Sequence, residues 1–548
     1  MNALKQFFSR PVGWVYLLVG LAAATLFFGA FARAYSPLFG LTRLLQVGKE
    51  YDDRGIAAFR TVPKYVDPTT PMGFDGQFYA ELALDPLLRD HQLSVALDNP
   101  TYRSRRILLP WLAWLGGWGR PAWILNAYVA LNPLFWIGFA VMMGWLFRPH
   151  GWAGAAGFAA MLMTCGIIES MHSSLTDFPG FVLLTLAMIA GGTGGAGLLA
   201  FATLAREPNL AGLVGLWDYR PPWLSTARRN LVVAAIAGVP LALWFAYVLS
   251  RFPPSVDTFA GGNLSWPMQG IMAKLGEVSV SIAQGEIRWG SWYSELFANR
   301  VLHALLTIVS VMTQCVFLLV HREWNSRIWR LGAVFVLYFL CISYIPWEDH
   351  FTITRHALPI TLAFNLILAM QARRAWLVWF LLGNCFVPFG IYQFTLRELF
   401  VPVPPVEYRI AAAPPTTPFV RLRFDQGWGD EEWIRQHTWR WALTRHATVV
   451  LTNPTSHPVS VSLSFLTKSI SVRDLKVGVR GTEVWSARGL QTSLPVATAP
   501  FLVAPGETVV SFDSTGGTVR PEDATDQRRL SFAVQDIALY LSAPPPAR

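Results

Sequence analysis

The chain has 548 residues, of which 53% are apolar and only 14% are charged, and its mean hydropathy is +0.37. Ordinary soluble proteins carry about 25% charged residues, so this composition excludes a purely soluble protein. It is also too polar for a chain built only of membrane helices, and the length exceeds that of one domain. We therefore expect a membrane part joined to a polar part.

The formal net charge is +10. In a soluble protein such an excess would raise nucleic acid as a partner, but here the basic residues lie mostly beside apolar runs, where they orient membrane helices. No nucleic-acid-binding motif accompanies them, so we expect the membrane bilayer as a partner and no nucleic acid. The cysteines lie inside apolar stretches without metal-binding spacing, as expected for core residues: Cys165, Cys315, Cys341 and Cys385.

A helix needs about 20 mostly apolar residues to cross a bilayer. The first such run extends from Val12 to Ala32 and is longer than the apolar part of a signal peptide, so we interpret it as an uncleaved anchor. Lys5 and Arg10 precede it, which predicts a cytoplasmic N-terminus. Residues 107–118 are too short to cross and are expected to form an interfacial helix. Further spans are predicted near residues 121–147, 151–168, 178–203, 230–250, 301–320, 331–346, 355–371 and 375–395.

About nine spans result when the glycine-rich stretch 178–203 is taken as one broken helix. This number places the arginine-dense short loops in the cytoplasm, as the positive-inside rule requires. These loops contain Arg148, Arg206, Arg220, Arg228, Arg229, Arg322, Arg327, Arg330, Arg373 and Arg374. The same number puts the loop 34–105, the turns 169–177 and 347–354, and the C-terminal region on the outer side.

The character of the chain changes near residue 401. Six prolines within 401–418 predict a stiff linker. Beyond it, Val459, Val461, Leu463 and Phe465 alternate with serines, which is the period of a half-buried strand, and turn residues punctuate further short strands. We predict a polytopic α-helical membrane domain over residues 1–400 and a β-sandwich over residues 419–548.

Tryptophans interleaved with arginines stand at the start of the predicted β-sandwich. They are either an aromatic platform for sugar rings or part of the core or a membrane-facing surface, and we favour the second interpretation. The residues are Trp428, Trp433, Trp439 and Trp441, with Arg435, Arg440 and Arg445.

The first outer loop holds the densest chemistry of the chain. Asp75 lies among glycines and aromatic residues, and Arg103, Arg105 and Arg106 follow at the predicted membrane surface. A carboxylate can deprotonate an acceptor hydroxyl, and arginine forks bind phosphate oxygens without losing their charge. This combination favours a site for a lipid-linked sugar phosphate.

Several motifs here resemble a known family. The pattern aromatic-Asp-Gly-x-aromatic-Tyr over residues 74–79 is followed by Asp-Pro at 85–86 and by Tyr-Arg-x-x-Arg-Ile-Leu-x-Pro over 102–110. The set resembles bacterial members of the C-type (GT-C) glycosyltransferase superfamily, and it is similar to the Trp-Asp motif of the phosphatidylinositol-glycan mannosyltransferases, with Phe74 in place of the tryptophan. Leu-Thr-Asp-Phe-Pro over 175–179 and Leu-Ala-Arg-Glu over 204–207 look like later motifs of the bacterial members.

The resemblance covers roughly the first 400 residues and implies a GT-C-like multi-span fold with an outer active site. It implies a polyprenyl-phosphate-linked sugar donor, a glycan or lipid acceptor of the cell envelope, and inversion at the anomeric carbon. Asp75 would correspond to the family's catalytic acidic residue. We therefore expect a glycosyltransferase of the bacterial cytoplasmic (inner) membrane whose C-terminal domain is periplasmic.

Other carboxylates compete with Asp75, since Asp-Gly alone is more often a turn than a catalytic site. Asp52 and Asp53 lie in the same loop and are alternative bases. Asp85 either ends a helix or takes part in catalysis. Asp177 is either a helix N-cap followed by proline or a residue that supports the site.

We expect the remaining predicted site residues to bind the donor or the acceptor. Donor phosphate is assigned to Arg103, Arg105, Arg106 and Arg355, which could alternatively anchor helices to lipid headgroups. Ionisable residues at membrane depth are functional candidates, and the substrate-binding set is Gln77, Tyr79, Tyr102 and His356. No cofactor is expected. A divalent metal near His350 and His356 is the less favoured alternative, because no third ligand is obvious.

Other functions remain open beside a single-sugar transferase. One is a lipid-linked oligosaccharide ligase or polymerase, and another is a non-catalytic transporter or scaffold of envelope glycan assembly. A transporter would be expected to show paired repeats and charges at the membrane midplane, whereas the acidic motifs of this chain cluster in outer loops.

Overall fold

The structure is a computed structural model. It describes residues 11–35, 39–67, 72–219, 221, 223–252, 262–283, 300–349, 351–371, 375–392, 420–434, 437–490, 494–520 and 528–542. The predicted linker 401–418 lies outside the described residues, as do Lys5, Arg10, His350, Arg373 and Arg374. The chain forms two compact units, one of residues 1–45 with 75–402 and the other of residues 46–74 with 403–548.

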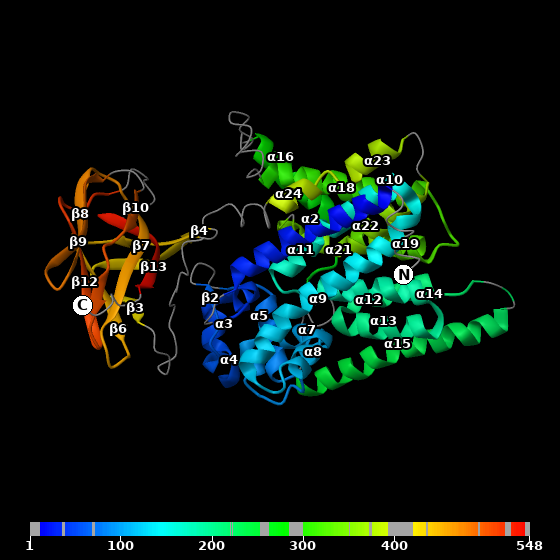
Figure 1. The fold of residues 1–548 in the computed structure, drawn as a ribbon, viewed down its shortest axis with the longest axis horizontal. Coiled ribbons are helices and arrows are strands. Elements are labelled where there is room, and N and C mark those ends of the chain that lie inside the picture. The colour runs from blue at the N-terminus through cyan, green and yellow to red at the C-terminus, as the bar shows by residue number, and fades with distance from the viewer. Residues whose placement is uncertain are drawn as a thin grey trace. The chain divides into compact units, whose positions relative to one another are not determined.

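The first unit is helical (Figure 1). Four of its segments are long and apolar enough to cross a membrane, judged by length and composition. They are Gly13–Ala34, Pro121–His172, Leu224–Arg251 and Val301–Val320. The expected helical, membrane-type N-terminal part is thereby confirmed, whereas the number of nine spans and their orientation stay predictions.

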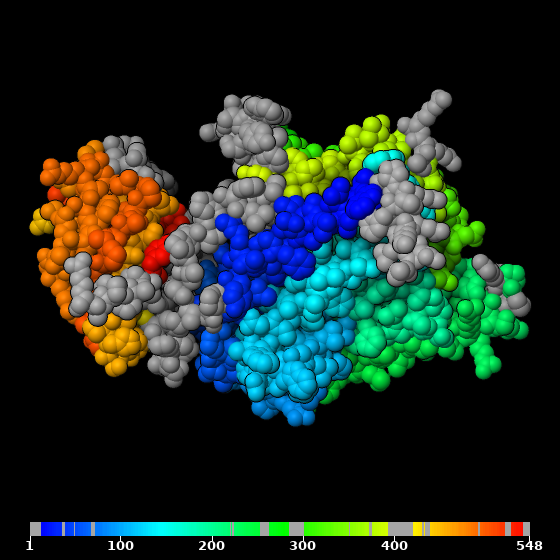
Figure 2. Space-filling view, viewed as in Figure 1, coloured from blue at the N-terminus to red at the C-terminus, as the bar shows by residue number. Residues whose placement is uncertain are grey.

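Helix α2 (Pro11–Ala34) has one face against the unit and one face outward. Tyr16 and Phe27 are buried, and the Tyr16 hydroxyl donates to the carbonyl of Phe147 at 2.8 Å. Leu18 and Leu21 are exposed, and α2 lies along the surface as the long blue band in Figure 2. An outward apolar face on a helix of 24 residues suits contact with lipid.

Several expected spans are shorter than predicted or divided in two. The span predicted at 331–346 is α19 (Arg327–Leu340). That at 355–371 is divided into α21 (Thr352–His356) and α22 (Leu358–Met370), and that at 375–395 into α23 (Trp376–Gly383) and α24 (Val387–Ile391). Pro359 and Pro388 stand in the first turns of α22 and α24. Proline disfavours helical geometry in the residue before it, so each break lies at the start of a helix.

The stretch predicted as one broken span, 178–203, is a helical hairpin. Helices α12 (Asp177–Ala190) and α13 (Gly192–Ala205) lie side by side (Figure 1). They turn at Gly191 and Gly192, both of which have positive φ, a conformation that favours glycine. Each helix has 14 residues and is about 21 Å long, shorter than the roughly 30 Å hydrocarbon core.

The hairpin overturns one part of the predicted topology. The predicted crossing separated Asp177 from Arg206, but their side chains form an ion pair at 2.6 Å, at the same end of the hairpin. The next segment, η3 (Glu207–Gly212) and α14 (Leu213–Leu216), runs back along α12, where Gly212 and Gly215 abut Leu184 and Met188. Three short antiparallel segments, namely α12, α13 and η3 with α14, therefore replace the single predicted span before α15 (Trp223–Arg251) begins.

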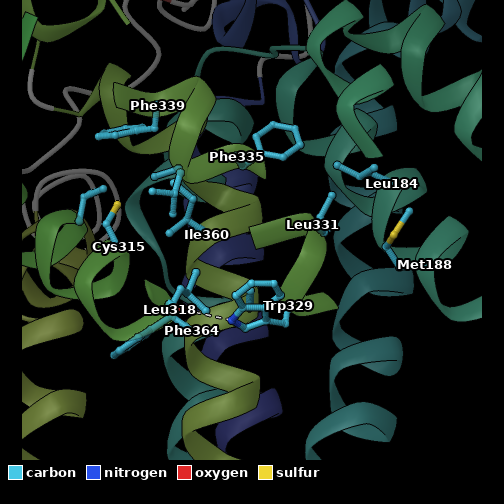
Figure 3. Close-up of a cluster of buried hydrophobic side chains, with 14 of the residues drawn as sticks. Leu184, Met188, Cys315, Leu318, Trp329, Leu331, Phe335, Phe339, Ile360 and Phe364 are labelled. Carbon is cyan, nitrogen blue, oxygen red and sulfur yellow. Dashed lines mark hydrogen bonds between the residues drawn. The ribbon is translucent and has the colours of Figure 1, made fainter. Parts of the chain in front are cut away.

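A large apolar core joins α12 and α13 to the helices that follow them. Figure 3 shows side chains from α12, α18 (Arg300–Val320), α19 and α22 in this core. Trp329 of α19 is buried and donates its indole N–H to the carbonyl of Leu318 at 3.0 Å. Because α22 is buried along almost its whole length, α21 is held on a rigid support.

The second unit contains the predicted β-sandwich. One sheet has the order β10-β7-β13-β5-β4, with β11 also paired to β7, and the other has the order β3-β6-β12-β8-β9. The strands are β3 (Arg421–Phe424), β4 (Trp428–Ile434), β5 (His437–Ala442), β6 (His446–Asn453), β7 (Val459–Ser469), β8 (Arg473–Val479), β9 (Thr482–Leu490), β10 (Leu494–Ala497), β11 (Phe501–Val503), β12 (Gly506–Ser514) and β13 (Phe532–Ser542). Apolar side chains of both sheets share one core.

The alternation predicted for β7 is confirmed. Val461, Leu463 and Phe465 are buried in the core, and Ser462 and Ser464 are more exposed. The first pair of the strand departs from the pattern, since Val459 is partly exposed and Ser460 is buried. Trp428 packs edge-on against Phe512 and Phe532 of this core. For this tryptophan, the prediction that it belongs to the core is confirmed. The unit also contains β1 (Val47–Gly48), α3 (Lys49–Arg54), α4 (Ala57–Thr61) and β2 (Val66–Asp67), and β1 and β2 pair in parallel.

Candidate active site

Asp75 immediately precedes helix α5 (Gly76–Leu84), and its neighbour Gly76 fixes where that helix begins. A Cβ at Gly76 would lie 2.3 Å from the carbonyl oxygen of Ser173 and 3.3 Å from that of Leu45. Only glycine permits this approach of two backbones. The Asp-Gly pair is therefore more than a surface turn, because the glycine seats the start of α5 against the turn that leads to Asp177.

Two arginines from distant parts of the chain flank the Asp75 carboxylate. Arg103, the last residue of α7 (Pro100–Arg103), places Nη2 2.9 Å from Oδ1, and Arg355 of α21 places Nη2 3.7 Å from Oδ2. The Asp75 side chain is 25% exposed. Arg103 is oriented by Asp98, which accepts from its Nε at 2.8 Å and its Nη2 at 2.6 Å.

The electrostatics keep Asp75 ionised. Burial alone would raise the pKa of this carboxyl, but the positive charges of Arg103 and Arg355 outweigh it, and the pKa lies below its ordinary value. Asp75 is consequently a carboxylate at neutral pH, able to accept a hydrogen bond or a proton from a bound hydroxyl.

Asp177 continues the network deeper into the helices. It is the first residue of α12, is 3% exposed, and pairs with Arg206 at 2.6 Å and with Arg355 at 3.9 Å. Gly180 allows the ends of α12 and α13 to approach, since a Cβ there would lie 3.2 Å from the Cβ of Ala205. Arg355 thus stands between two aspartates, one partly exposed and one sealed.

His356 lies on the far side of Arg206. Arg206 Nη2 is 2.9 Å from His356 Nδ1, and the Tyr338 hydroxyl is 3.3 Å from the same nitrogen. A guanidinium can only donate, so the imidazole accepts this bond and is in its neutral form. His356 therefore orients Arg206 rather than adding positive charge.

Two further contacts hold the pieces in place. On α11 (Cys165–His172), a Cβ at Gly166 would lie 2.8 Å from the Cα of Arg355, so glycine lets α21 pack closely there. From α9 (Pro121–Phe147), Tyr128 donates to the carbonyl of Ser174, and Asn132 donates to that of Leu175. These bonds fix the strained turn before Asp177, where Ser174 has a positive φ.

Arg106 organises a second layer of the site. Its three nitrogens contact the hydroxyl of Tyr79 at 2.9 Å, the hydroxyl of Tyr102 at 2.7 Å and Glu207 at 3.1 Å. Asn263 also donates to the Tyr102 hydroxyl, at 3.0 Å. With every nitrogen of Arg106 engaged, this side chain acts as a brace for the two tyrosines.

Arg105 lies beside the same carboxylate, with its Nε 3.7 Å from Glu207. Its guanidinium also stands over the rings of Tyr102 and Phe245. Because Arg103 also stands over the rings of Tyr79 and Tyr102, all four arginines predicted to bind phosphate belong to one connected cluster.

A small cavity adjoins the deeper part of this network. It has room for about one water molecule. Its polar lining residues are Asp177, Arg206, Asn209, Tyr338 and Arg355, and its apolar lining residues include Phe181, Phe335 and Leu358. Charged groups and hydrocarbon thus face the same space.

The remaining predicted residues have other surroundings. Asp52 forms an ion pair with Lys64 at 2.6 Å within the second unit, and Asp53 is exposed on α3 of that unit. Asp85 directly follows the last residue of α5, as its interpretation as a helix end predicts, and it accepts from the backbone N–H groups of Arg89 and Asp90. Gln77 is buried in the first turn of α5.

Sequence reasoning missed four members of the cluster: Asp98, Arg206, Glu207 and Tyr338. The Leu-Ala-Arg-Glu stretch at 204–207 was recognised as a motif but assigned to the opposite side of the membrane. The Gly-Gly-Thr-Gly-Gly run at 191–195 permits a tight turn, and this signal could have placed residues 204–207 on the same side as Asp177.

No group of three or more His, Cys, Asp or Glu suited to a metal ion occurs among the described residues. Within the cluster each carboxylate pairs with an arginine instead. Independence from metal remains a prediction, which a chelator can test.

Comparisons with known proteins are sparse. No family model matches the chain, and no curated protein matches it. Among solved structures, arabinosyltransferase EmbB from Mycobacterium smegmatis aligns over 85% of this chain and 64% of its own, with 10% identity and a TM-score of 0.29. The GH26-CBM35 β-(1,4)-mannanase of Podospora anserina aligns over 26% of this chain and 28% of its own, with 13% identity and a TM-score of 0.16. The chain thus spans less than two thirds of either protein.

Proposed function

We propose that the chain is a membrane glycosyltransferase of the GT-C type that takes its sugar from a polyprenyl-phosphate-linked donor. One observation carries the proposal: a partly exposed carboxylate, Asp75, stands between Arg103 and Arg355. A base and paired phosphate-binding cations are the groups that transfer from a sugar phosphate to a hydroxyl requires. The acceptor is a glycan or lipid of the cell envelope.

In the proposed reaction, Asp75 accepts the proton of the acceptor hydroxyl while that oxygen attacks the anomeric carbon. The bond between the anomeric carbon and the phosphate oxygen breaks, and its electron pair leaves with the polyprenyl phosphate. Attack from the face opposite the leaving group inverts the anomeric centre. Arg103 and Arg355 stabilise the charge that develops on the phosphate.

The donor phosphate has a specific place in this scheme. Among the described residues, Nη1 of Arg103 makes no hydrogen bond, whereas its Nε and Nη2 are held by Asp98 and Asp75. Arg355 lines the small cavity, as do the apolar side chains of Phe181 and Phe335. We assign the phosphate to Arg103 and Arg355, and the first hydrocarbon of the carrier to the side of Phe181 and Phe335.

Asp75 and the donor phosphate share two arginines, so donor binding changes the basicity of the Asp75 carboxylate. In the free protein these arginines hold the Asp75 pKa low, which makes it a weak base. A phosphate between them supplies a second negative charge and so raises that pKa toward the working pH. The base therefore strengthens when the donor arrives.

Arginines at one end of the hairpin support an orientation of the fold in the membrane. At the Gly191 end of the hairpin, Arg327 donates to the carbonyl of Met188 and Arg330 to that of Gly215, and Arg229 pairs with Asp218. Basic residues favour the cytoplasmic side. We infer that the Asp75 end faces the periplasm of the inner membrane, as the C-terminal domain would. A reporter fused after Arg548 should then be active only outside the cytoplasm, and cytoplasmic activity would refute this orientation.

The decisive test compares two aspartates of the first loop. Cells carrying only Asp75→Asn should lose the glycan product, because removal of a general base lowers turnover by about 10²–10⁴-fold. Cells carrying only Asp53→Asn, a change at an exposed carboxylate, should keep it. The readout is glycan analysis, supported by thermal-shift measurements of the purified proteins with a panel of polyprenyl-phosphate monosaccharides.

The outcomes separate the alternatives. Unchanged product with Asp75→Asn removes Asp75 from the mechanism, and loss only with Asp53→Asn moves the base to the second unit. If the donors stabilise the wild-type protein but neither the wild type nor Asp53→Asn transfers sugar, the transferase proposal fails and a binding role remains.

A further inference from the structure

We propose that one face of the six-stranded sheet of the second unit is a binding site for a neutral oligosaccharide. This tryptophan face consists of Glu432, Trp439, Trp441, Lys468 and Gln535. The inference does not depend on the Asp75 site, because it rests on side chains of the β-sandwich alone.

Strand register puts these side chains on one side of the sheet. Trp439 and Trp441 are two residues apart on β5 and so project to the same face. Gln535 pairs with Trp439, and Ala533 pairs both with Trp441 and with Lys468 of β7. The intervening Val534 and the neighbouring Phe532 point into the core instead, so the tryptophan face is turned away from the core.

The two indole rings form a fixed platform. Lys468 Nζ lies 5.2 Å from the ring centroid of Trp439 and 5.6 Å from that of Trp441. The Trp439 N–H donates to Glu432 Oε2 at 3.1 Å, and Glu432 also pairs with Arg528. Between Lys468 and Trp441 stands only the small, fully buried Ala533, so the platform has no bulky residue in its middle. Rings held in this way lose little conformational entropy when a ligand binds.

The chemistry of the face matches a sugar chain. Pyranose rings present an apolar C–H face, which packs on indole, and a rim of hydroxyls, which needs donors and acceptors. Glu432, Lys468 and Gln535 supply both kinds of group beside the rings. Charges of both signs border the face, which favours a neutral glycan over a polyanion.

Trp428 shows what a purely structural tryptophan of this domain looks like. It lies in the shared core against Phe512 and Phe532. Trp439 and Trp441 are only half-buried and stack on a lysine instead. Burial would stabilise the domain more, because exposed cation–π contacts contribute little.

The test uses the full chain in lipid nanodiscs without maltoside detergent, which would compete as a sugar. Isothermal titration calorimetry is run with three hexasaccharides, of β-1,4-linked glucose, β-1,4-linked mannose and α-1,6-linked mannose. We expect at least one to bind, Trp441→Ala and Trp439→Ala to weaken it at least tenfold, and Trp441→Phe to retain most of the affinity. Trp266→Ala, which changes a highly exposed tryptophan of the first unit, is the matched control.

The remaining outcomes decide against the proposal. It is overturned if no hexasaccharide binds, or if binding survives both alanine variants while their melting temperatures match the wild type. Because the titration contains no sugar donor and measures no transfer, failure of the transferase proposal and failure of this one are distinguishable.

Discussion

Asp75 and Asp177 belong to one charge network but differ in exposure, which suits Asp75 to catalysis and Asp177 to a structural role. Asp75 is 25% exposed and shares Arg103 with Asp98, at 2.9 and 2.6 Å. Asp177 is 3% exposed and is locked by Arg206 at 2.6 Å. Arg355 links the two. A shared, partly exposed carboxylate is available to a substrate, whereas a sealed pair can only hold its neighbours in place.

The largest expected effect is a difference in the free energy of unfolding between Asp177→Asn and Asp75→Asn. Asp177→Asn leaves Arg206 buried without its counter-ion, and breaking a buried pair from one side costs about 3–5 kcal/mol. Asp75→Asn should cost less, because Arg103 keeps Asp98 and Arg355 keeps Asp177. Melting temperatures of the purified proteins measure the difference, with Asp53→Asn as the unperturbed control.

A double variant sharpens this prediction. Asp177→Asn combined with Arg206→Gln removes both charges together, so we expect it to be more stable than Asp177→Asn alone. If the double variant is as unstable as the sum of the single ones, the two residues do not act as a pair.

The next effect concerns the arginines on either side of Asp75. Lysine lacks the planar fork that lets one side chain engage two partners. Arg103→Lys and Arg355→Lys should therefore lower kcat/KM for the donor about 10–100-fold, equivalent to about 1.4–2.7 kcal/mol. In a transfer assay, Arg33→Lys at the end of α2 serves as the control. Full activity in both site variants would exclude them from phosphate binding.

A smaller effect tests the packing that brings Arg355 to the site. Gly166→Ala would press α11 against the backbone of α21, and we expect a loss of turnover of about tenfold together with a lower melting temperature. Gly197→Ala on α13 faces open space and should be neutral or slightly stabilising. Equal behaviour of the two variants would contradict the role given to Gly166.

The smallest effect is a pH dependence. Because the folded pKa of Asp75 lies below the unfolded value of about 3.9, its contribution to stability is present above about pH 4 and is lost as the pH falls through the folded pKa. The melting-temperature gap between wild type and Asp75→Asn should therefore stay constant from pH 7 to pH 5 and shrink below about pH 4. A gap that shrinks between pH 7 and pH 5 would mean that Asp75 is not held ionised by its arginines.

The sequence alone determined the composition-driven features of this protein. Apolar length predicted α2, α9 and α15, and the period of two predicted the buried face of β7, because these signals are local to each segment. The Asp75 and Arg103 motifs could also be found, since both lie within a single loop. Their neighbours at 204–207 were recognised only as a motif.

Only the tertiary structure decided that Arg206, Arg355 and Asp177 meet Asp75. These residues are up to 280 positions apart in the printed numbering, and no local pattern encodes their distance. Their meeting depends on a tight turn at Gly191 and on backbone approaches at Gly76, Gly166 and Gly180. A glycine in a sequence says that close contact is permitted, but the partner that fills the space is set by the packing of the whole helical unit.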